Sequence, residues 1–568
     1  MSNEFRTNIG KSIFETKYKH GQCETWQELS KTLIEDVCED NMPFSKKHLL
    51  KNAHSEKKFI AGGRYLYYAG RPNKFFNNCY LLKAEEDSRE DWANLSWKSE
   101  SCLTTGGGIG TDYSIYRPRG SKLSKTGGEA SGPISKMKMI NEIGREVVQG
   151  GSRRSAIYGS LNWKHADIPE FLKVKNWYEQ MIPGTDITVG EAKEADFNYH
   201  APLDMTNISL NYDNEFLEEL YGEGIDGVYY KLYESDHNPT IKEIPDTFIQ
   251  NVRQALSTGE PGFSFNFFDK ENETLRNACT EVTSEDDSDV CNLGSVNLAE
   301  IKDKDELYEV CYLASQFLLC GTLKADLPYE KVYEIREKNR RLGLGLMGIH
   351  EWLLQRGYNY EVTDELHEWL DIYRRASEEG ANNLADELGI SRPVAYRAIA
   401  PTGTIAMLAG TTSGIEPIFA VAYKRRYLKN NQWHYQYMVD GTAQDLIDRY
   451  NVDPNTIESA IDLAKDPERR IKFQADIQDY IDMSISSTIN LPQWGTEYNN
   501  ESHVNSFAHT LARYAHRLRG FTCYPNGARG GQPLTSVSYD EAIQNTGKEF
   551  KEYTDVCEIT GKGGTCGI

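Results

Sequence analysis

The stretch NACTEVTSEDDSDVCNLGSVNL, residues 277–298, combines the pattern of β-strands with side chains that can carry chemistry. Asn277, Cys279 and Glu281 occupy alternate positions, so an extended backbone would direct an amide, a thiol and a carboxylate to one face. Polar groups on an inward face need partners or a ligand. Cys291 begins a second strand-like run, CNLGSVNL. A cysteine in an apolar strand is more often a small buried hydrophobe, so the spacing alone leaves packing and chemistry both open.

Short apolar runs alternate with helical patterns on both sides of this stretch. MTNISLNY (205–212), GFSFNFF (262–268) and AIAPTGTIAMLAG (398–410) alternate with patterns such as DELYEVCYLASQFLLCGTL (305–323). This order predicts βα units and an α/β fold with a largely parallel sheet or barrel. We expect three regions: a mainly helical N-terminal region over residues 1–75, a catalytic domain over 76–535, and a flexible, glycine-bearing tail over 536–568.

The composition excludes several function classes. The 568 residues are 39% hydrophobic and 26% charged with a net charge of -22, which argues against a nucleic-acid-binding surface. Neither an apolar signal core nor a membrane-spanning run occurs, so we expect a cytoplasmic protein with no membrane partner. Its 11 cysteines include no CxxC, and no zinc-like spacing is present. We therefore expect no metal bound by protein side chains, and cysteines that pack or do redox chemistry.

Two glycine-bearing segments can approach a ligand closely. Residues 400–410, APTGTIAMLAG, begin with a turn of small residues and continue as a helix, which leaves backbone N–H groups for an anion. The alternative is an ordinary helix start capped by Thr402 or Thr404. The glycines at 106–108 and 110 permit close approach of a base or sugar. They do not form a dinucleotide-binding GxGxxG, because position 111 is Thr.

A dozen motifs in a fixed order resemble the catalytic chain of ribonucleotide reductases, most closely the adenosylcobalamin-dependent class. The likeness runs from about residue 10 to the tail. The motifs are NNCYLL, GGGIGTDYS, RPRGS, GGEASGPIS, NEIGREVVQGGSRRSA, HADIPEFL, NACTEV, CNLGSVNL, NRRLGLGLMG, APTGTIAMLAGTTSGIEP, STINLP and GARGGQPLT. The resemblance implies a ten-stranded α/β barrel of two antiparallel five-stranded halves, with a central finger loop.

The resemblance also implies a role for each matching residue. Cys279 would carry the thiyl radical at the tip of the finger loop and abstract the 3′-hydrogen of the ribose. Glu281 would be the general base for the 3′-hydroxyl, and Asn277 would orient the substrate hydroxyls. Cys79 and Cys291 would supply a proton and two electrons and end as a disulfide. Reduction at C2′ needs two electrons, so three thiols and a base form the minimal set.

The resemblance implies further contacts with the substrate. Asn78, beside Cys79, and Gly108 would contact it. A loop would hold its diphosphate or triphosphate, and the sequence leaves the choice between the two open. The residues of that loop are Pro401, Thr402, Gly403, Thr404 and Ile405.

A radical on Cys279 could come from three sources. A partner subunit would need an adjacent tyrosine pair near the tail, but Tyr539 and Tyr553 are isolated. A glycyl radical would need an Arg-x-x-Gly-Tyr loop, which the ending GGTCGI lacks. Adenosylcobalamin remains as the expected cofactor. The alternatives are the large subunit of a partner-dependent reductase and, outside reductases, an inactive nucleotide-binding regulator or a plain disulfide oxidoreductase. The three matched thiols argue against the regulator, and the lack of CxxC against the oxidoreductase.

Two cysteines in the tail, Cys557 and Cys566, suggest a redox shuttle. The tail would exchange with the Cys79–Cys291 disulfide and be reduced by a thioredoxin- or glutaredoxin-type partner, since exchange requires direct sulfur contact. Eight residues separate the two, more than in the family's usual close pair. We expect no ATP cone before the helical region, dNTP or ATP as possible specificity effectors, and a monomer or homodimer.

Overall fold

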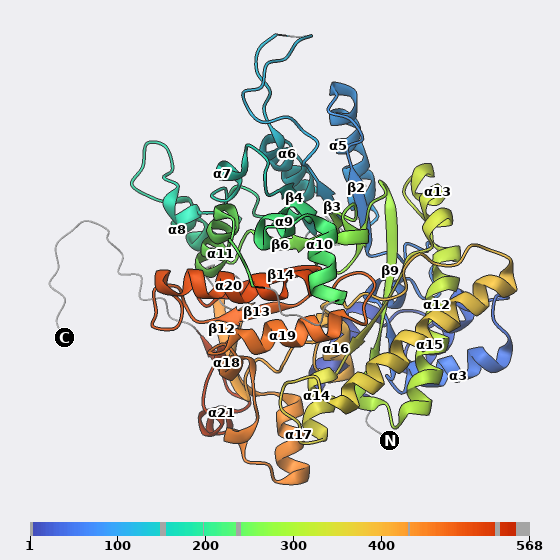
Figure 1. The fold of residues 1–568 in the computed structure, drawn as a ribbon. Helices are drawn as coiled ribbons and strands as arrows, with labels where there is room; N and C mark the ends of the chain where they lie inside the picture. Colours follow the sequence, from blue (N-terminus) through green and yellow to red (C-terminus); the bar gives the residue numbers. More distant parts are fainter. Residues whose placement is uncertain are drawn as a thin grey trace, which may run out of the picture.

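The computed structural model describes residues 4–125, 127–147, 155–196, 198–234, 240–429, 432–528 and 534–551 (Figure 1). Strands lie in the centre of the molecule with helices around them, so the predicted α/β class is confirmed. Among the described residues, no helix is both long and apolar enough to cross a bilayer.

The N-terminal region contains several short helices and one strand. Its elements are α1 (Asn8–Ile13), α2 (Trp26–Cys38), α3 (Phe44–Ser55), β1 (Phe59–Ala61) and α4 (Gly63–Tyr68). Helix α2 starts at a capping box in which the side chain of Thr25 accepts from the backbone of Glu28, and that of Glu28 accepts from Thr25. One face of this helix is buried, and its apolar residues, among them Trp26, Leu29 and Leu33, recur every three or four positions.

Five neighbouring strands run parallel in chain order. They are β2 (Cys79–Lys83), β3 (Gly108–Asp112), β4 (Ile157–Asn162), β5 (Thr206–Tyr212) and β6 (Gly262–Phe265). Helices connect them, and the chief ones are α5 (Arg89–Thr104), α6 (Pro133–Glu146), α9 (Asn214–Tyr221) and α11 (Asp246–Thr258). Parallel neighbours require such crossovers, so the predicted βα units are confirmed.

Antiparallel neighbours extend the sheet at both edges. Strand β9 (Asp289–Asn297) pairs with β2, and β14 (Gly520–Pro525) pairs with β6. Strand β10 (Leu342–Met347) is parallel to β9, and β13 (Thr488–Leu491) is parallel to β14. With β1, which is antiparallel to β9, the sheet has ten strands.

The backbone between β10 and β13 carries isolated parallel bridges. Leu344 pairs with Arg397, and Ile399 pairs with Ile485. Helices α12 (Lys304–Lys324) and α15 (Asp364–Leu388) pack together beside these strands (Figure 1).

A short hairpin between β6 and β9 holds residues 277–282. Its strands are β7 (Leu275–Arg276) and β8 (Thr283–Ser284). It lies against β3, where a Cβ on Gly110 would come within 1.6 Å of the carbonyl oxygen of Arg276. Asn207 at the start of β5 donates to the carbonyl of Ala278 at 2.9 Å. The hairpin is therefore held from two strands of the parallel set.

A second sheet lies near the C-terminal end, and the sequence analysis did not predict it. It consists of β15 (Leu534–Ser536), β11 (Ala422–Lys429), β12 (Gln432–Val439) and β16 (Glu549–Lys551). Helix α21 (Tyr539–Asn545) and β16 occupy residues that we expected in the flexible tail. The ring of Phe550 stacks on Tyr435 with centroids 5.2 Å apart, which gives this segment a packing partner. Cys557 and Cys566 lie outside the described residues.

We expect Gly110→Ala to lower the free energy of unfolding by about 1–3 kcal/mol or more, because its methyl group would meet backbone rather than a side chain that can rotate away. Denaturant unfolding measures this change. Gly441→Ala is the matched control, since the nearest atom to its Cβ is the Thr7 methyl at 3.7 Å. Equal stability of the two variants would contradict the close approach of the hairpin to β3.

Candidate active site

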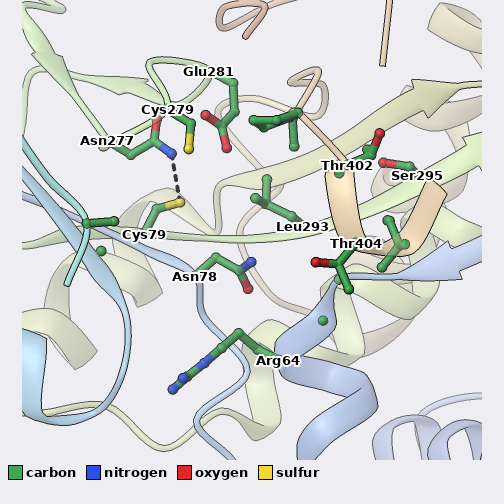
Figure 2. A pocket seen from close by; sticks show the side chains of 18 of the residues that line it. Arg64, Asn78, Cys79, Asn277, Cys279, Glu281, Leu293, Ser295, Thr402 and Thr404 are labelled. Carbon is green, nitrogen blue, oxygen red and sulfur yellow. Dashed lines mark hydrogen bonds between the residues drawn. The ribbon is translucent and has the colours of Figure 1, made fainter. Parts of the chain in front are cut away.

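A cavity of about 350 Å³ opens at the tip of the hairpin (Figure 2). It collects residues from the start of β2, the start of β3, the hairpin, and the loop before helix α16 (Gly403–Ala409). Of the residues predicted from the sequence, the following line it: Asn78, Cys79, Gly108, Asn277, Cys279, Glu281, Pro401, Thr402, Gly403, Thr404 and Ile405. Cys291 does not line it.

The hairpin turn brings Asn277, Cys279 and Glu281 together. Thr280 has φ 70°, and its N–H donates to the carbonyl of Asn277 at 2.9 Å, which closes a turn at the tip. The prediction that these residues converge through strand alternation is therefore wrong: the backbone between Asn277 and Glu281 turns instead of extending. The side chain of Asn277 accepts from the N–H of Val282 at 3.0 Å, which stiffens the turn. Cys279 is exposed at the tip.

Asn277 also connects the hairpin to β2. Its Nδ2 donates to the sulfur of Cys79 at 2.9 Å, across 198 positions of sequence. Figure 2 shows this bond, with Cys279 and Glu281 beside it. An amide, two thiols and a carboxyl group thus share one wall of the cavity.

Glu281 is the buried acid of this wall. Its side chain is 1% exposed, and among the described residues Oε2 has no hydrogen-bond partner. Burial raises the pKa of Glu281 to about 7, and the hydrogen bond from Asn277 only partly offsets this. A carboxyl group with this pKa can take and return a proton near neutral pH.

Cys79 and Cys291 lie directly opposite each other on the antiparallel strands β2 and β9. Opposed residues in antiparallel strands have Cα atoms about 4.5–5.5 Å apart, within the range of about 4.4–6.8 Å that a disulfide spans. Burial raises the pKa of both thiols well above the ordinary value. Both are therefore protonated at neutral pH and can donate hydrogen as well as electrons.

The loop 401–405 lies across the cavity from Asn277 and Cys79, as Thr402 and Thr404 in Figure 2 show. Thr402 has φ 54° and occupies the N-cap position of α16, but its side chain makes no cap hydrogen bond. Instead its Oγ1 accepts from the N–H of Gly414 at 2.8 Å. A Cβ added at Gly403 would meet no described atom within 4 Å. The side chain of Thr402 therefore does not cap the first N–H groups of the helix, and Thr404, the other cap that the sequence left open, lies inside α16.

A second cavity of about 680 Å³ adjoins the first and shares Ala278, Cys279 and Pro401 with it. Phe419, Tyr423 and Asp440 also line it, together with Asn207, Ser486, Ser487, Thr488, Asn490 and Thr522. Ser487, Thr488 and Asn490 belong to the motif STINLP, but no local pattern indicates that this motif meets residues of distant segments such as Asn207 and Tyr423. Among the predicted catalytic side chains, only Cys279 faces both cavities.

A family model described as "Ribonucleotide reductase, barrel domain" matches residues 77–371 and 389–524, most of the chain. This chain belongs to the ribonucleotide reductase family. The resemblance drawn from the motifs is thereby confirmed.

The similar relatives include reductases of named cofactor class. The vitamin B12-dependent ribonucleoside-diphosphate reductase of Mycobacterium tuberculosis (strain CDC 1551 / Oshkosh) is 26% identical over 586 residues, 94% of this chain and 77% of the relative. The protein of the same name from Thermoplasma acidophilum is 26% identical over 532 residues, which cover 85% of this chain and 65% of the relative. A protein of Mycobacterium phage D29, named as a putative adenosylcobalamin-dependent ribonucleoside-triphosphate reductase, is 28% identical over 403 residues, which cover 61% of this chain and 52% of the relative.

Two arginines near the reductase site were not predicted. Arg64 lines the first cavity, and its guanidinium donates to the carbonyls of Phe75 and Thr105, which ties α4 to the loop before β3. Arg341, just before β10, pairs with Asp289 at 2.9 Å. The motif NRRLGLGLMG contains Arg341, whereas Arg64 lies outside the motifs of the resemblance, and an arginine in a motif does not indicate which way its side chain points.

We expect ionisation of Glu281 to oppose folding. A carboxyl with a folded pKa of about 7 and an ordinary value of 4.5 favours the folded state below pH 4.5, and this contribution is lost as pH rises through 7. The loss amounts to roughly 3 kcal/mol. In Glu281→Gln, the free energy of unfolding should lack this fall between pH 4.5 and 7, measured by denaturant unfolding against pH. The exposed Glu337→Gln is the control. An unchanged pH dependence in Glu281→Gln would contradict the assignment.

Proposed function

We propose that this chain reduces ribonucleotides to 2′-deoxyribonucleotides, with Cys279 as its thiyl-radical residue and adenosylcobalamin as the radical source. The observation that carries the proposal is the position of Cys279. It faces a cavity that holds an acid, an amide and a cysteine of the opposed pair, and it also faces a second, larger cavity. A sulfur in both can receive a radical on one side and use it on the other.

The residues of the first cavity match the chemistry of the reduction. The Cys279 thiyl takes the 3′-hydrogen of the ribose, and Glu281 takes the proton of the 3′-hydroxyl, for which a pKa of about 7 is suited. Asn277 orients the hydroxyls and the Cys79 thiol through its hydrogen bond. The 2′-hydroxyl leaves as water with a proton from Cys79.

The two electrons come from Cys79 and Cys291, which become a disulfide, and the Cys279 thiol then returns its hydrogen to C3′ and becomes a thiyl radical again. The opposed positions of the pair on β2 and β9 support this role. One ribonucleotide and two thiols thus yield one deoxyribonucleotide, one water and one disulfide.

The loop 401–405 would hold the substrate phosphates, and Asn78 and Gly108 would contact the nucleoside. The N–H groups at the start of α16 support the former, because no side chain caps them from Thr402. Gly108 lines the cavity between Ala156 and Ala278, so any side chain there would occupy the space of a ligand.

The residues that line the second cavity suit adenosylcobalamin. It combines the rings of Phe419 and Tyr423 with hydroxyl and amide groups such as Ser486 and Asn490, which suit a large macrocycle rimmed with amides. When bound, adenosylcobalamin supplies the organic radical that oxidises the Cys279 thiol. The hairpin contacts from Asn207 hold that thiol in place beside the cavity.

We also propose that the ten strands belong to a closed barrel around the hairpin. The parallel bridges Leu344–Arg397 and Ile399–Ile485 support it, since they lie between β10 and β13, the ends still to be joined. The N–H of Ser484 donates to the carbonyl of Glu281 at 2.9 Å, so the hairpin is held from this side too. In this arrangement residues 76–535 would form the catalytic domain.

The partners follow from the same chemistry. A thioredoxin- or glutaredoxin-type dithiol would renew the Cys79–Cys291 pair through Cys557 and Cys566 in the tail, in the cytoplasm. In support, the tail follows β16, whose sheet contributes Tyr423 and Leu534 to the wall of the second cavity. In this proposal a dNTP or ATP acts as an effector of specificity, and the chain is a monomer or a homodimer.

The second candidate is the large subunit of a partner-dependent reductase. The ribonucleoside-diphosphate reductase subunit alpha of Chlamydia muridarum supports it, with 24% identity over 453 residues, 64% of this chain and 42% of the relative. The larger coverage of the vitamin B12-dependent relatives and the lack of a tyrosine pair after residue 500 favour adenosylcobalamin.

We expect the isolated chain to form deoxynucleotide from a ribonucleoside di- or triphosphate, anaerobically with dithiothreitol, only when adenosylcobalamin is added. Cys279→Ser should reduce product to background because no sulfur then carries the radical. Cys23→Ala, at a buried cysteine far from the site in sequence, is the control and should keep activity. Product that depends on a second subunit instead of adenosylcobalamin would overturn the cofactor assignment.

A further inference from the structure

The two cysteines of the β2–β9 pair differ in their access to the cavity. Cys79 lines it, and in Figure 2 its sulfur lies toward Asn277 and Cys279. Cys291 does not line it, although its neighbour Leu293 does. A molecule that enters the cavity therefore meets the sulfur of Cys79 first.

Strand β10 covers Cys291 on the other side. A Cβ on Gly343 would lie 2.4 Å from Cδ2 of Leu293 and 3.1 Å from the sulfur of Cys291, so a glycine here lets the backbone of β10 pack closely against both side chains. The thiol of Cys291 donates to the carbonyl of Asn292 at 3.3 Å. The sulfur of Cys291 thus packs against the backbone of β10, and it lines neither the first nor the second cavity.

The charges around the two sulfurs also differ. Arg341 is 5% exposed at its side chain, and Nη2 donates to Ser284 in addition to the pair of Nε with Asp289. Its positive charge lowers the pKa of Cys291, against the effects of burial, Asp289 and Glu281.

The charges that act most strongly on Cys79 are all negative. Burial raises the pKa of its thiol most, and the charges of Glu281, Cys291 and Cys279 raise it further. Among these largest effects, the hydrogen bond from Asn277 is the one that lowers the pKa. A thiolate is therefore better stabilised at Cys291 than at Cys79.

We propose that reduction of the Cys79–Cys291 disulfide follows a fixed order, in which the incoming thiolate attacks Cys79 and Arg341 stabilises the Cys291 thiolate that leaves. This rests on the proposed function only for the existence of the disulfide. The attacking sulfur forms a bond to Cys79 as the Cys79–Cys291 bond breaks, and the bonding pair goes to Cys291. The second thiol of the reductant then attacks its own partner sulfur and releases Cys79, which takes a proton. A dithiol is oxidised and both cysteines are reduced.

The reverse order is disfavoured by space and by charge. Exchange at sulfur requires the attacking thiolate to approach opposite the leaving sulfur, and a thiol that leaves with a lower pKa leaves faster. A thiolate in the first cavity meets Cys79 and not Cys291, which packs against Gly343, and attack on Cys291 would leave a Cys79 thiolate beside Glu281. Arg341 is thus a positioning residue for the exchange, since it acts through Cys291.

The mixed disulfide on Cys79 maps the order directly. A full-length chain with Cys279→Ser, Cys557→Ser and Cys566→Ser keeps the β2–β9 pair but neither the finger thiol nor the tail thiols. Diamide oxidises the pair, glutathione reacts briefly, and acid quench is followed by N-ethylmaleimide under denaturing conditions. Peptide mass spectrometry should find glutathione on Cys79 and maleimide on Cys291, in excess of about tenfold over the reverse. Equal amounts, or glutathione on Cys291, would overturn the order.

Arg341 is tested in the same background. Arg341→Gln should slow the attack by glutathione about tenfold, and Arg341→Lys should keep most of the rate because it keeps the charge. With Cys79→Ser added, the pH midpoint for alkylation of Cys291 should rise in Arg341→Gln, which a purely structural role would not produce. Arg397→Gln, another buried ion-paired arginine, is the matched control. Equal rates in the Gln and Lys variants would contradict the role of Arg341.

The outcomes separate the order of exchange from the proposed function. Diamide makes the disulfide without turnover, so a chain that makes no deoxynucleotide would still show the order. If Arg341→Gln does not fold, the glutathione mapping with Arg341 intact still decides. Failure of diamide to join Cys79 and Cys291 would overturn the order and the dithiol role together.

Discussion

The close approach of the hairpin backbone to β3 is the constraint on which the site depends. Gly110 lets the carbonyl of Arg276 lie where a side chain would otherwise be. The buried Arg276 then joins the base of the hairpin to Asn266, after β6, and to the carbonyl of Arg519, before β14. With the base held on two sides, the tip can project Cys279 into open space while Asn277 reaches Cys79. A Cys279 that moved freely could not meet a substrate at a defined carbon.

Burial has opposite uses for the groups around this tip. It keeps the thiols of Cys79 and Cys291 protonated, and it brings the pKa of Glu281 to about 7, so that the acid can exchange a proton near neutrality. The same low polarity would make a lone thiolate costly, and Arg341 offsets that cost on one sulfur only. The arrangement therefore separates a hydrogen-donating cysteine that faces the cavity from a cysteine that is placed to leave as an anion.

The sequence predicted the chemistry better than the geometry. The motifs singled out Cys79, Asn277, Cys279, Glu281 and Cys291, and the structure brings these five residues together at the hairpin tip and on β2 and β9. Strand alternation was the wrong reason for their convergence, since a residue with φ 70° at Thr280 cannot be seen in a two-residue period. The register that opposes Cys79 and Cys291 joins positions 212 residues apart and depends on the whole sheet. The second cavity and the sheet of β11, β12, β15 and β16 also arise from distant contacts, for which no local pattern exists.

The central claim is that the sulfur of Cys279 takes the 3′-hydrogen of a ribonucleotide. The direct measurement is anaerobic turnover of ribonucleotide labelled with tritium at C3′, with adenosylcobalamin and dithiothreitol, compared between the unchanged chain and Cys279→Ser. We predict an isotope effect on deoxynucleotide formation in the unchanged chain. In Cys279→Ser we predict neither product nor cleavage of the C3′–H bond. Deoxynucleotide formed without a 3′ isotope effect, or formed by Cys279→Ser, would contradict it.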